Sequence, residues 1–429
     1  TISTGTVDAN GTFDATNGAI DINGAGDLQL AGVVTSLGDV SIDFGTVTYD
    51  GAGDQAIVAD DYFSLTAGGA AGIKTLSGAV NIAGDLAIDA GVTIAMGINN
   101  LTVTGATTIP GAVTITTATL DANGTFDATG GTITFTEAGN LNLAGTVTDL
   151  GTLTSVGFGT VTYDGAGDQA IVADDYFSLT AGGGAGIKTL GGNVTVTNDF
   201  TIDTDVTIAM DTHDLTVRDD TDIDGTIAVA GNTLTLDGAS DIDGIVTIST
   251  GNVDANDSFD ATGGMITFTG AGDLTLFSTV TDLGTLSGTG TVTYDGVNQT
   301  VFSDAYYNLT AGNSSGTKTL GGTVTVANDL VINAGVTIDV SSSDDYSISV
   351  GGALENNGTF SAREGTVIFN GSDNQIFTPG SSSYYDITLN NAGDDKLLTI
   401  VGDLEIDHDL TLNDGILDFD TNDPAISVA

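Results

Sequence analysis

Internal repetition is the feature that most limits what this chain can fold into. One stretch, GTVTYDGAGDQAIVADDYFSLTAGG, occurs twice without a single change, at 45–69 and at 159–183. Copies of two opening motifs begin at Thr1, Thr114 and Thr247, and at Gly45, Gly159, Gly290 and Gly365. The five intervals are 113, 133, 114, 131 and 75, and each is within two of a multiple of nineteen. We therefore interpret nineteen residues as one structural unit of a repeat protein.

Repeats of unequal length favour a solenoid over a series of sandwich domains. Each coil of a solenoid contacts only its neighbours, so coils can be gained or lost. The two sheets of a β-sandwich instead close around a fixed set of strands. The block containing GTIAVAGNTLTLDGAS, between Leu215 and Val246, has the character of one added coil. Tandem β-sandwich domains remain the alternative.

Short segments such as TVTY, SLTA and MITF alternate apolar and polar residues with the period of a β-strand. They are separated by Gly, Asn or Asp turns. We predict an all-β fold, a β-solenoid with three short strands in each coil of about nineteen residues. A right-handed β-helix is favoured because the strict six-residue rhythm of left-handed solenoids is missing. We expect residues 1–429 to form one continuous solenoid, with repeat units at 1–113, 114–246, 247–364 and, in part, 365–429.

The acidic composition restricts the partners of this chain. Asp and Glu number 57 against 6 Lys and Arg, for a formal net charge of −51. Nucleic acid is excluded because no basic surface could meet its phosphates, and no apolar run is long enough for membrane insertion. There is no cysteine, which excludes disulfides and thiolate chemistry. The chain begins on Thr within a repeat, as expected of a processed product or an excised piece.

Alternating aspartates suggest calcium as a cofactor. The segment DDTDIDG places Asp220, Asp222 and Asp224 at every second position, and Asp241 and Asp243 repeat part of this pattern. Calcium-binding loops use such spacing, although the twelfth position here would be Gly231 in place of a bidentate Glu. Low-affinity calcium binding and a solvated acidic turn therefore both remain open.

Aromatic and basic residues recur at fixed spacing in the four copies. The first aromatic of each pair is Tyr62, Tyr176, Tyr306 or Tyr384, and twelve positions later stand Lys74, Lys188, Lys318 and Lys396. Adjacent aromatics in a strand point to opposite faces, so one of each pair should enter the core. We expect the lysines to neutralise nearby Asp or to cover the outer aromatic. An intermolecular contact, a lysine–asparagine isopeptide bond, or inheritance by duplication without a role are the alternatives.

The sequence offers few residues that could form a catalytic site. His213 and His408 are the only histidines, Arg218 and Arg363 are the only arginines, and tryptophan is absent. Two histidines that lie far apart in the sequence give no basis for a Ser/His/Asp arrangement. We predict that the chain is not an enzyme. Polysaccharide cleavage by paired carboxylates and ice binding by Thr-x-Thr segments are minor alternatives.

The run GTVTYDG…Q…YYNLTAG…GTKTLGGTVTVANDLVINAGVTI at 290–338 resembles repeats of very large bacterial secreted surface proteins, the filamentous-haemagglutinin-like and autotransporter-type adhesins. The resemblance covers nearly the whole chain as a pattern of composition and rhythm. It implies a β-solenoid stalk outside the cell, at the surface or released, after bacterial-type secretion. It carries over no functional residue.

These observations predict an extracellular structural protein. We expect a building block of a surface filament, stalk or layer, whose partner is itself and which assembles through the solenoid ends. The alternative is an adhesin that binds glycans or host surfaces through exposed aromatics of the repeated pairs.

Overall fold

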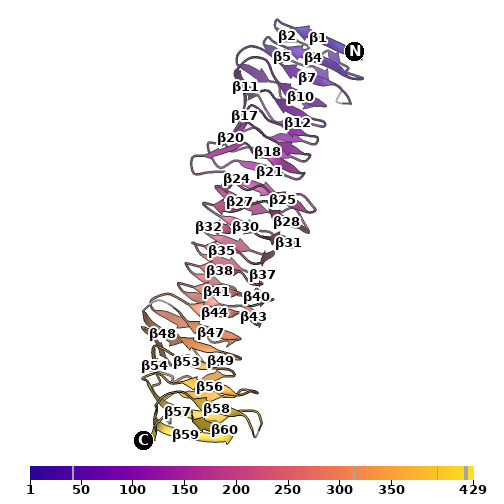
Figure 1. Cartoon of the computed structure of the whole chain (residues 1–429). Helices are drawn as coiled ribbons and strands as arrows, with labels where there is room; N and C mark the ends of the chain where they lie inside the picture. Colours follow the sequence, from indigo (N-terminus) through magenta and orange to yellow (C-terminus); the bar gives the residue numbers. More distant parts are fainter. Residues whose placement is uncertain (41–42, 313–314, 394, 420–423) are drawn as a thin grey trace. The chain divides into compact units, whose positions relative to one another are not determined.

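The chain winds into a β-solenoid. The computed structural model describes residues 1–429 except 41–42, 313–314, 394 and 420–423. Within this part, sixty-one strands form about 21 turns of roughly 20 residues, with no helix (Figure 1). Neighbouring strands within each stack pair in parallel, as between β10 and β13. The predicted β-solenoid is therefore confirmed, and the sandwich alternative is wrong because sandwiches are built from antiparallel sheets.

One turn consists of three short strands joined by bends. For example, β10 (Ser64–Ala67), β11 (Gly72–Leu76) and β12 (Val80–Ile82) follow one another. The chain then returns in β13 (Leu86–Ile88), which places Leu86 beside Leu65. Both leucines are buried, so equivalent apolar side chains stack along the inside of the solenoid. No helix that could cross a membrane occurs among the described residues.

The chain divides into two compact units, the first being Thr1–Ala209. Its strands form three stacked sets. One contains β1 (Gly5–Ala9), β4 (Gly26–Leu30), β7 (Thr46–Tyr49), β10, β13, β16 (Thr107–Thr108), β19 (Phe126–Asp127), β22 (Val147–Asp149), and then β25 (Gln169–Ile171), β28 (Gly186–Leu190) and β31 (Val206–Ala209) as a separate sheet. The second contains β2 (Phe13–Asp14) with β5 (Val34–Ser36), then β8 (Gln55–Ile57), β11, β14 (Val92–Gly97), β17 (Ala112–Ile115), β20 (Thr132–Phe135) and β23 (Thr152–Ser155), and then β26 (Asp175–Tyr176) with β29 (Val194–Val196). The third contains β3 (Ala19–Ile20) with β6 (Asp39–Val40), then β9 (Asp61–Tyr62), β12, β15 (Leu101–Val103), β18 (Thr119–Ala122), β21 (Asn140–Leu143), β24 (Thr160–Tyr163), β27 (Ser178–Ala181) and β30 (Phe200–Ile202).

The second unit, Met210–Ala429, has the same three-sided organisation. One set contains β32 (Leu215–Val217), β35 (Thr233–Leu236), β38 (Asn252–Ala255), β41 (Asp273–Leu276), β44 (Thr291–Tyr294), β47 (Asn308–Ala311), β50 (Leu330–Ile332), β53 (Leu354–Asn356), β56 (Gln375–Thr378), β58 (Leu397–Ile400) and β60 (Ile416–Phe419). A second contains β33 (Thr221–Ile223), β36 (Ser240–Ile242), β39 (Phe259–Asp260) and β42 (Val280–Asp282), and then β45 (Gln299–Val301), β48 (Gly316–Leu320), β51 (Val336–Asp339) and β54 (Thr359–Ser361). The third contains β34 (Thr226–Val229), β37 (Ile245–Ile248), β40 (Met265–Phe268) and β43 (Thr285–Gly288), and then β46 (Ala305–Tyr306), β49 (Val324–Val326), β52 (Ile348–Val350), β55 (Thr366–Phe369), β57 (Ser383–Asn390), β59 (Leu404–Asp414) and β61 (Ile426–Val428).

Turn length is variable around its mean. Leu215 lies beside Leu234, nineteen positions on, as the repeat interval predicts. Thr291 lies beside Asn308, only seventeen positions on, whereas Val324 lies beside Ile348, twenty-four positions on. The predicted coil of nineteen is thus close to the observed average of roughly 20 residues per turn, and insertions or deletions at the bends produce the spread.

The long repeat is not a whole number of turns. The equivalent strands β7 and β24 lie in different stacked sets of the first unit. They are seventeen strands apart, which is five turns and two further sides. In the second unit, the equivalent strands β44 and β55 also lie in different sets. Six coils of nineteen residues would fill the interval of 114 from Gly45 to Gly159, but the chain spans it in five turns and two sides. The copies within each unit therefore face different sides of the solenoid.

Candidate functional site

Three of the four repeated lysines are buried inside the solenoid. In the first copy, Lys74 is 0% exposed and its Nζ donates to the carbonyl oxygens of Gly51 and Gly53, at 2.8 and 3.1 Å. A third hydrogen bond, of 2.6 Å, reaches Oε1 of Gln55, the residue beside Lys74 in the parallel pair of β8 and β11. Three acceptors match the three N–H groups of an ammonium. The Lys74 side chain thus links the loop after β7 to β11 in the next turn of the solenoid.

The glutamine completes this network. Gln55 Oε1 also accepts from the Gly51 amide at 2.8 Å, and its Nε2 donates to the carbonyls of Leu30 and Gly32 in the preceding turn. Three successive turns are therefore connected by one buried polar cluster. Buried polar groups cost free energy unless they are paired. A lysine is possible in the core here because every N–H group of its ammonium has an acceptor in this cluster.

The second and third copies repeat this arrangement. Lys188 donates to the carbonyls of Gly165 and Gly167 and to Oε1 of Gln169, at 2.5, 3.1 and 2.6 Å. Lys318 donates to the carbonyl of Gly296 and, at 3.3 Å, to Oε1 of Gln299. Both lysines are 0% exposed.

The fourth copy departs from the pattern. Gln375 lies beside Leu398, and Lys396 is two positions earlier and half-buried. Leu398 is buried where the other copies have lysine. The twelve-position spacing from Tyr384 to Lys396 therefore does not place this lysine in the same environment as the other three.

The repeated tyrosines form a second buried network. In the first copy, Tyr49 and Tyr62 approach with their hydroxyl oxygens 3.0 Å apart. Tyr62 OH donates to the Val58 carbonyl at 2.7 Å, and the Val58 amide donates to Tyr49 OH at 3.1 Å. The remaining proton must then run from Tyr49 OH to Tyr62 OH, which closes a ring around the backbone of Val58.

The same ring recurs twice and is rebuilt once. Tyr163 with Tyr176 encloses the backbone of Val172, and Tyr294 with Tyr306 encloses that of Phe302. In the fourth copy, Phe369 replaces the first tyrosine. There, Tyr384 OH lies 3.1 Å from the Pro379 carbonyl, to which it donates, and 3.1 Å from Asn356 Nδ2, from which it accepts. An asparagine of the preceding turn thus supplies the partner that phenylalanine lacks.

Burial shifts the ionisation of both networks. It raises the pKa of Tyr163 and of Tyr294 to about 12, because a phenolate would lose its hydration in the core. It lowers the pKa of Lys188, an effect that the carboxylates of Asp164 and Asp168 oppose. Burial also raises the pKa of Asp164, whose Oδ1 has no hydrogen-bond partner among the residues that the structure describes.

The outward aromatics belong to the second position of each pair. Tyr62, Tyr176, Tyr306 and Tyr384 are all buried, whereas Phe63, Phe177 and Tyr385 are half-buried and Tyr307 is exposed. Beside Tyr307 the surface is hollowed into a groove of about 640 Å³, lined by polar groups that include Asp329 and Asp373. Gly352 lines this groove, and a Cβ added there would lie 2.5 Å from Asp329 Oδ1. The groove combines an exposed aromatic face with carboxylates.

The aspartates predicted to bind calcium are all exposed: Asp222 and Asp241 lie on strands, and Asp220, Asp224 and Asp243 lie just outside them. Asp222 of β33 lies beside Asp241 of β36, which in turn lies beside Asp260 of β39, so the three form a column along one side. Asp224 and Asp243 are also outside the core, and Asp220 accepts a hydrogen bond from the Ala239 amide at 3.1 Å. The pKa of Asp241 is raised, first by partial burial and then by the carboxylates of Asp243, Asp260 and Asp224.

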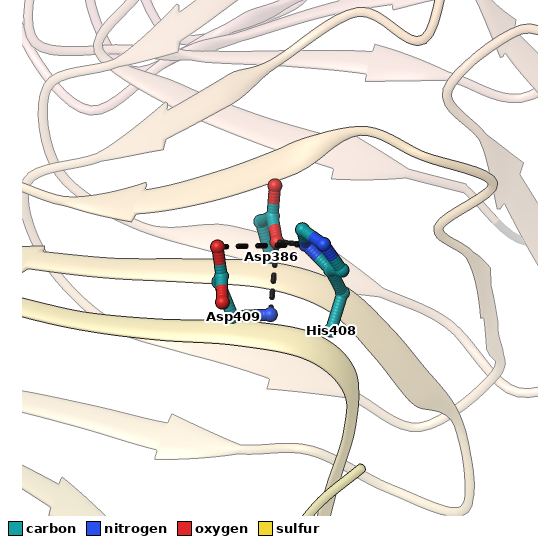
Figure 2. A group of neighbouring side chains, drawn as sticks. All are labelled: Asp386, His408 and Asp409. Atoms are coloured by element: carbon teal, nitrogen blue, oxygen red, sulfur yellow. Dashed lines mark hydrogen bonds and ion pairs between the residues drawn. The ribbon is translucent and has the colours of Figure 1, made fainter.

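A histidine and two aspartates meet on the second unit. His408 Nδ1 lies 2.8 Å from Asp386 Oδ1 and 3.6 Å from Asp409 Oδ2 (Figure 2). The hydrogen bond to Asp386 raises the pKa of His408. Sequence reasoning missed this cluster because Asp386 and His408 are 22 positions apart and are brought together by strand pairing. It also missed the glutamines as lysine partners, although each stands nineteen positions before its lysine, at Lys74, Lys188 or Lys318.

The comparisons with known proteins add no relative. No protein-family model matches the chain, and neither a curated protein nor a solved structure does so.

Proposed function

We propose that this chain is a non-enzymatic structural segment of a secreted bacterial surface protein, a β-solenoid building block of a filament, stalk or layer. One observation carries the proposal: the polar residues that the first three copies share are used inside the solenoid. Lys188, Gln169 and the tyrosine pair bond to the backbone and to one another. Duplication of the segment has therefore repeated hydrogen-bond networks that stabilise the turns.

The proposed partner is a further copy of the chain. Strands of a solenoid turn pair with whatever parallel strand covers them, and turns stack by the same contacts throughout. The proposal also includes calcium, because the column of Asp222, Asp241 and Asp260 brings carboxylates of successive turns together. Divalent cations would reduce the repulsion among carboxylates of a chain with a net charge of −51.

Electron microscopy of the full chain tests this proposal. Samples in millimolar calcium and in excess chelator are compared, with light scattering of the same samples for molar mass. We expect end-to-end or lateral assemblies in calcium that loosen in chelator. Isolated particles of one chain under both conditions, at all concentrations tested, would reject self-assembly.

Location is tested separately in the source cells. We expect an antibody against this segment to label intact cells or the medium, and added protease to remove the cell-surface signal. A signal that appears only after the cells are broken would contradict a place outside the cell.

Glycan binding is the second candidate function, and the groove beside Tyr307 favours it. Aromatic faces stack on sugar rings, and carboxylates and amides accept or donate hydrogen bonds to hydroxyls. Tyr307, Asp329 and Asp373 line the same groove. A glycan array is the test: binding by the full chain should be lost in Tyr307→Ala and retained in Phe177→Ala, the equivalent outward position of the second copy. Equal binding by both variants would reject this groove as the site.

A further inference from the structure

The cluster of Asp386, His408 and Asp409 differs from the rest of the acidic surface by its imidazole. The three residues each offer one ligand atom, and these atoms all lie within 4.8 Å of one another (Figure 2). They come from the neighbouring strands β57 and β59. Among the described residues, this is the group of metal-ligating side chains that meets this distance.

A β-bulge creates the cluster. In the pairing of β57 with β59, Tyr384 lies beside Ile406 and Asp386 lies beside Asp409. Tyr385 is therefore opposite two residues, Asp407 and His408, and the register shifts by one. In a regular strand His408 and Asp409 would point to opposite faces, but here both are exposed.

Neighbouring groups hold the ligands in place. The ring of Tyr385 stacks on that of His408, with centroids 4.7 Å apart and an angle of 9° between the planes. The amide of Asp409 donates to Asp386 Oδ1 at 3.0 Å, which fixes that carboxylate beside the imidazole. In the described part of the chain, both carboxylates form ion pairs with His408 alone. No lysine or arginine thus competes for them there.

We propose that Asp386, His408 and Asp409 form a binding site for a divalent transition metal, for which Zn²⁺ is the probe. Imidazole nitrogen with two carboxylate oxygens is a ligand set suited to zinc, whereas calcium and magnesium prefer oxygen alone. Binding would replace the hydrogen bond between Asp386 and His408 Nδ1 by two bonds to the metal. The ring then carries one proton, on Nε2, and the proton displaced from Nδ1 passes to Nε2 or, where Nε2 already carries one, to water. The side chains of His408 and Asp409 are 51% and 71% exposed, which leaves coordination positions open to water or to a ligand from outside.

Calorimetric titration of the full chain with ZnCl₂ tests the site. The buffer contains physiological salt and excess calcium, so that ordinary carboxylates are already screened or occupied. We expect one site per chain that is distinct from any weaker binding. His408→Gln should weaken this site at least tenfold, and Asp386→Asn should weaken it as well.

His213→Gln is the matched control, because it removes the other histidine and leaves the cluster intact. It should bind zinc as the unaltered chain does. Circular dichroism of each variant checks that the fold is retained, and a zinc-dependent rise in melting temperature in the unaltered chain but not in His408→Gln gives a second readout. The proposal is overturned if His408→Gln binds zinc with unchanged affinity, or if the unaltered chain shows only weak binding that is indistinguishable from that of the variant.

Discussion

At the scale of single residues, the unusual feature is a lysine in the core of a β-solenoid. Lys74 is tolerated because two loop carbonyls and a glutamine oxygen accept hydrogen bonds from its three N–H groups. The ammonium group acts as a bound metal cation would, because carbonyl oxygens of the loop backbone all point toward it. Loss of the lysine would leave these acceptors buried without a donor, and each such group costs about 1–3 kcal/mol.

Lys318→Met should therefore destabilise the third copy by about 2–4 kcal/mol. Hydrogen exchange followed by mass spectrometry should show faster exchange in the loop from Asp295 to Gln299. The third copy is chosen because its loop sequence is unique, whereas 45–69 and 159–183 are identical and give identical peptides. Lys396→Met is the control and should change little, since Lys396 does not lie beside Gln375. Equal protection of the loop in Lys318→Met and in the unaltered chain would contradict the role of the ammonium.

The tyrosine rings predict loss of stability at alkaline pH. Burial raises the pKa of Tyr163 and Tyr294 to about 12, above the usual value near 10. A raised pKa in the folded state means that the unfolded chain releases these protons first, so the stability contribution is complete below pH 10 and is lost as pH rises toward 12. The pKa of Lys188 is lowered, which acts in the opposite direction, but its window lies below the usual lysine value of 10.5.

We expect the melting temperature to fall steadily between pH 10 and pH 12. Tyrosinate absorbance in the near ultraviolet should appear together with the loss of the β-sheet circular dichroism signal. Full ionisation of all ten tyrosines near pH 10 with the sheet signal intact would show that the rings are accessible to solvent.

At the scale of elements, the alternation of apolar and polar residues predicted most strands, but it did not predict the polar side chains that some strands bury. TVTY correctly indicates β7, with Val47 and Tyr49 inward. In GIKTL the same logic fails: Ile73 is 46% exposed and Lys74 is buried. The phase of β11 is set by Leu76 and by the loop carbonyls that accept from the ammonium. A pattern of single residues cannot show such a partner, because Gln55 and Gly51 lie one turn away.

Pairing between turns also decided what could be predicted of the candidate sites. The spacing of Asp220, Asp222 and Asp224 suggests a loop around one ion, but the structure stacks Asp222 on Asp241 of the next turn. The His408 cluster depends on a bulge that shifts the register by one residue. Both arrangements follow from which residues face each other across strands. Turn lengths that vary between seventeen and twenty-four hide that register from the sequence.

The aspartate column predicts an effect of charge on β36. Asp241 lies between two carboxylates in the ladder, and like charges on facing positions are destabilising. Asp241→Asn should therefore raise stability at pH 7 and low salt, by up to about 1 kcal/mol. The gain should shrink in high salt, and also in millimolar calcium if the cation bridges the column. Thermal melts measure it, with Glu137→Gln as a control for loss of one exposed charge elsewhere. A gain that calcium leaves unchanged would argue against bridging.

At the scale of the whole molecule, the repeat interval is not a whole number of turns. This mismatch allows a test of whether the stability of one turn depends on distant turns. The interval from β7 to β24 is five turns and two sides, so the second copy faces a different side from the first. Its inner networks are nevertheless the same, bond for bond, in Lys74 and Lys188. The surroundings that a copy requires are thus confined to the adjacent turns.

Deletion of residues 46–159 joins Gly45 to Thr160 and removes one repeat interval without changing any local contact. The strand β24 would then stack on β4 as β7 does now, because 159–183 has the same sequence as 45–69. The strands after Gly183 keep the neighbours they already have. We expect the shortened chain to keep the β-sheet circular dichroism spectrum, resistance to limited proteolysis and a melting temperature within a few degrees of the full chain.

Deletion of residues 46–165 is the matched control, because it removes only six residues more and eliminates β24 together with Tyr163 and Gly165. It should leave Lys188 and Gln169 without the Gly165 groups that they bond to, and Tyr176 without its ring partner. Protease should then cut the turns on either side of the junction. If both shortened chains are folded, these networks are not needed to hold the adjacent turns together. If both are unfolded, restoring the adjacent contacts is not enough, and the stability of the solenoid must come from contacts that the whole length provides.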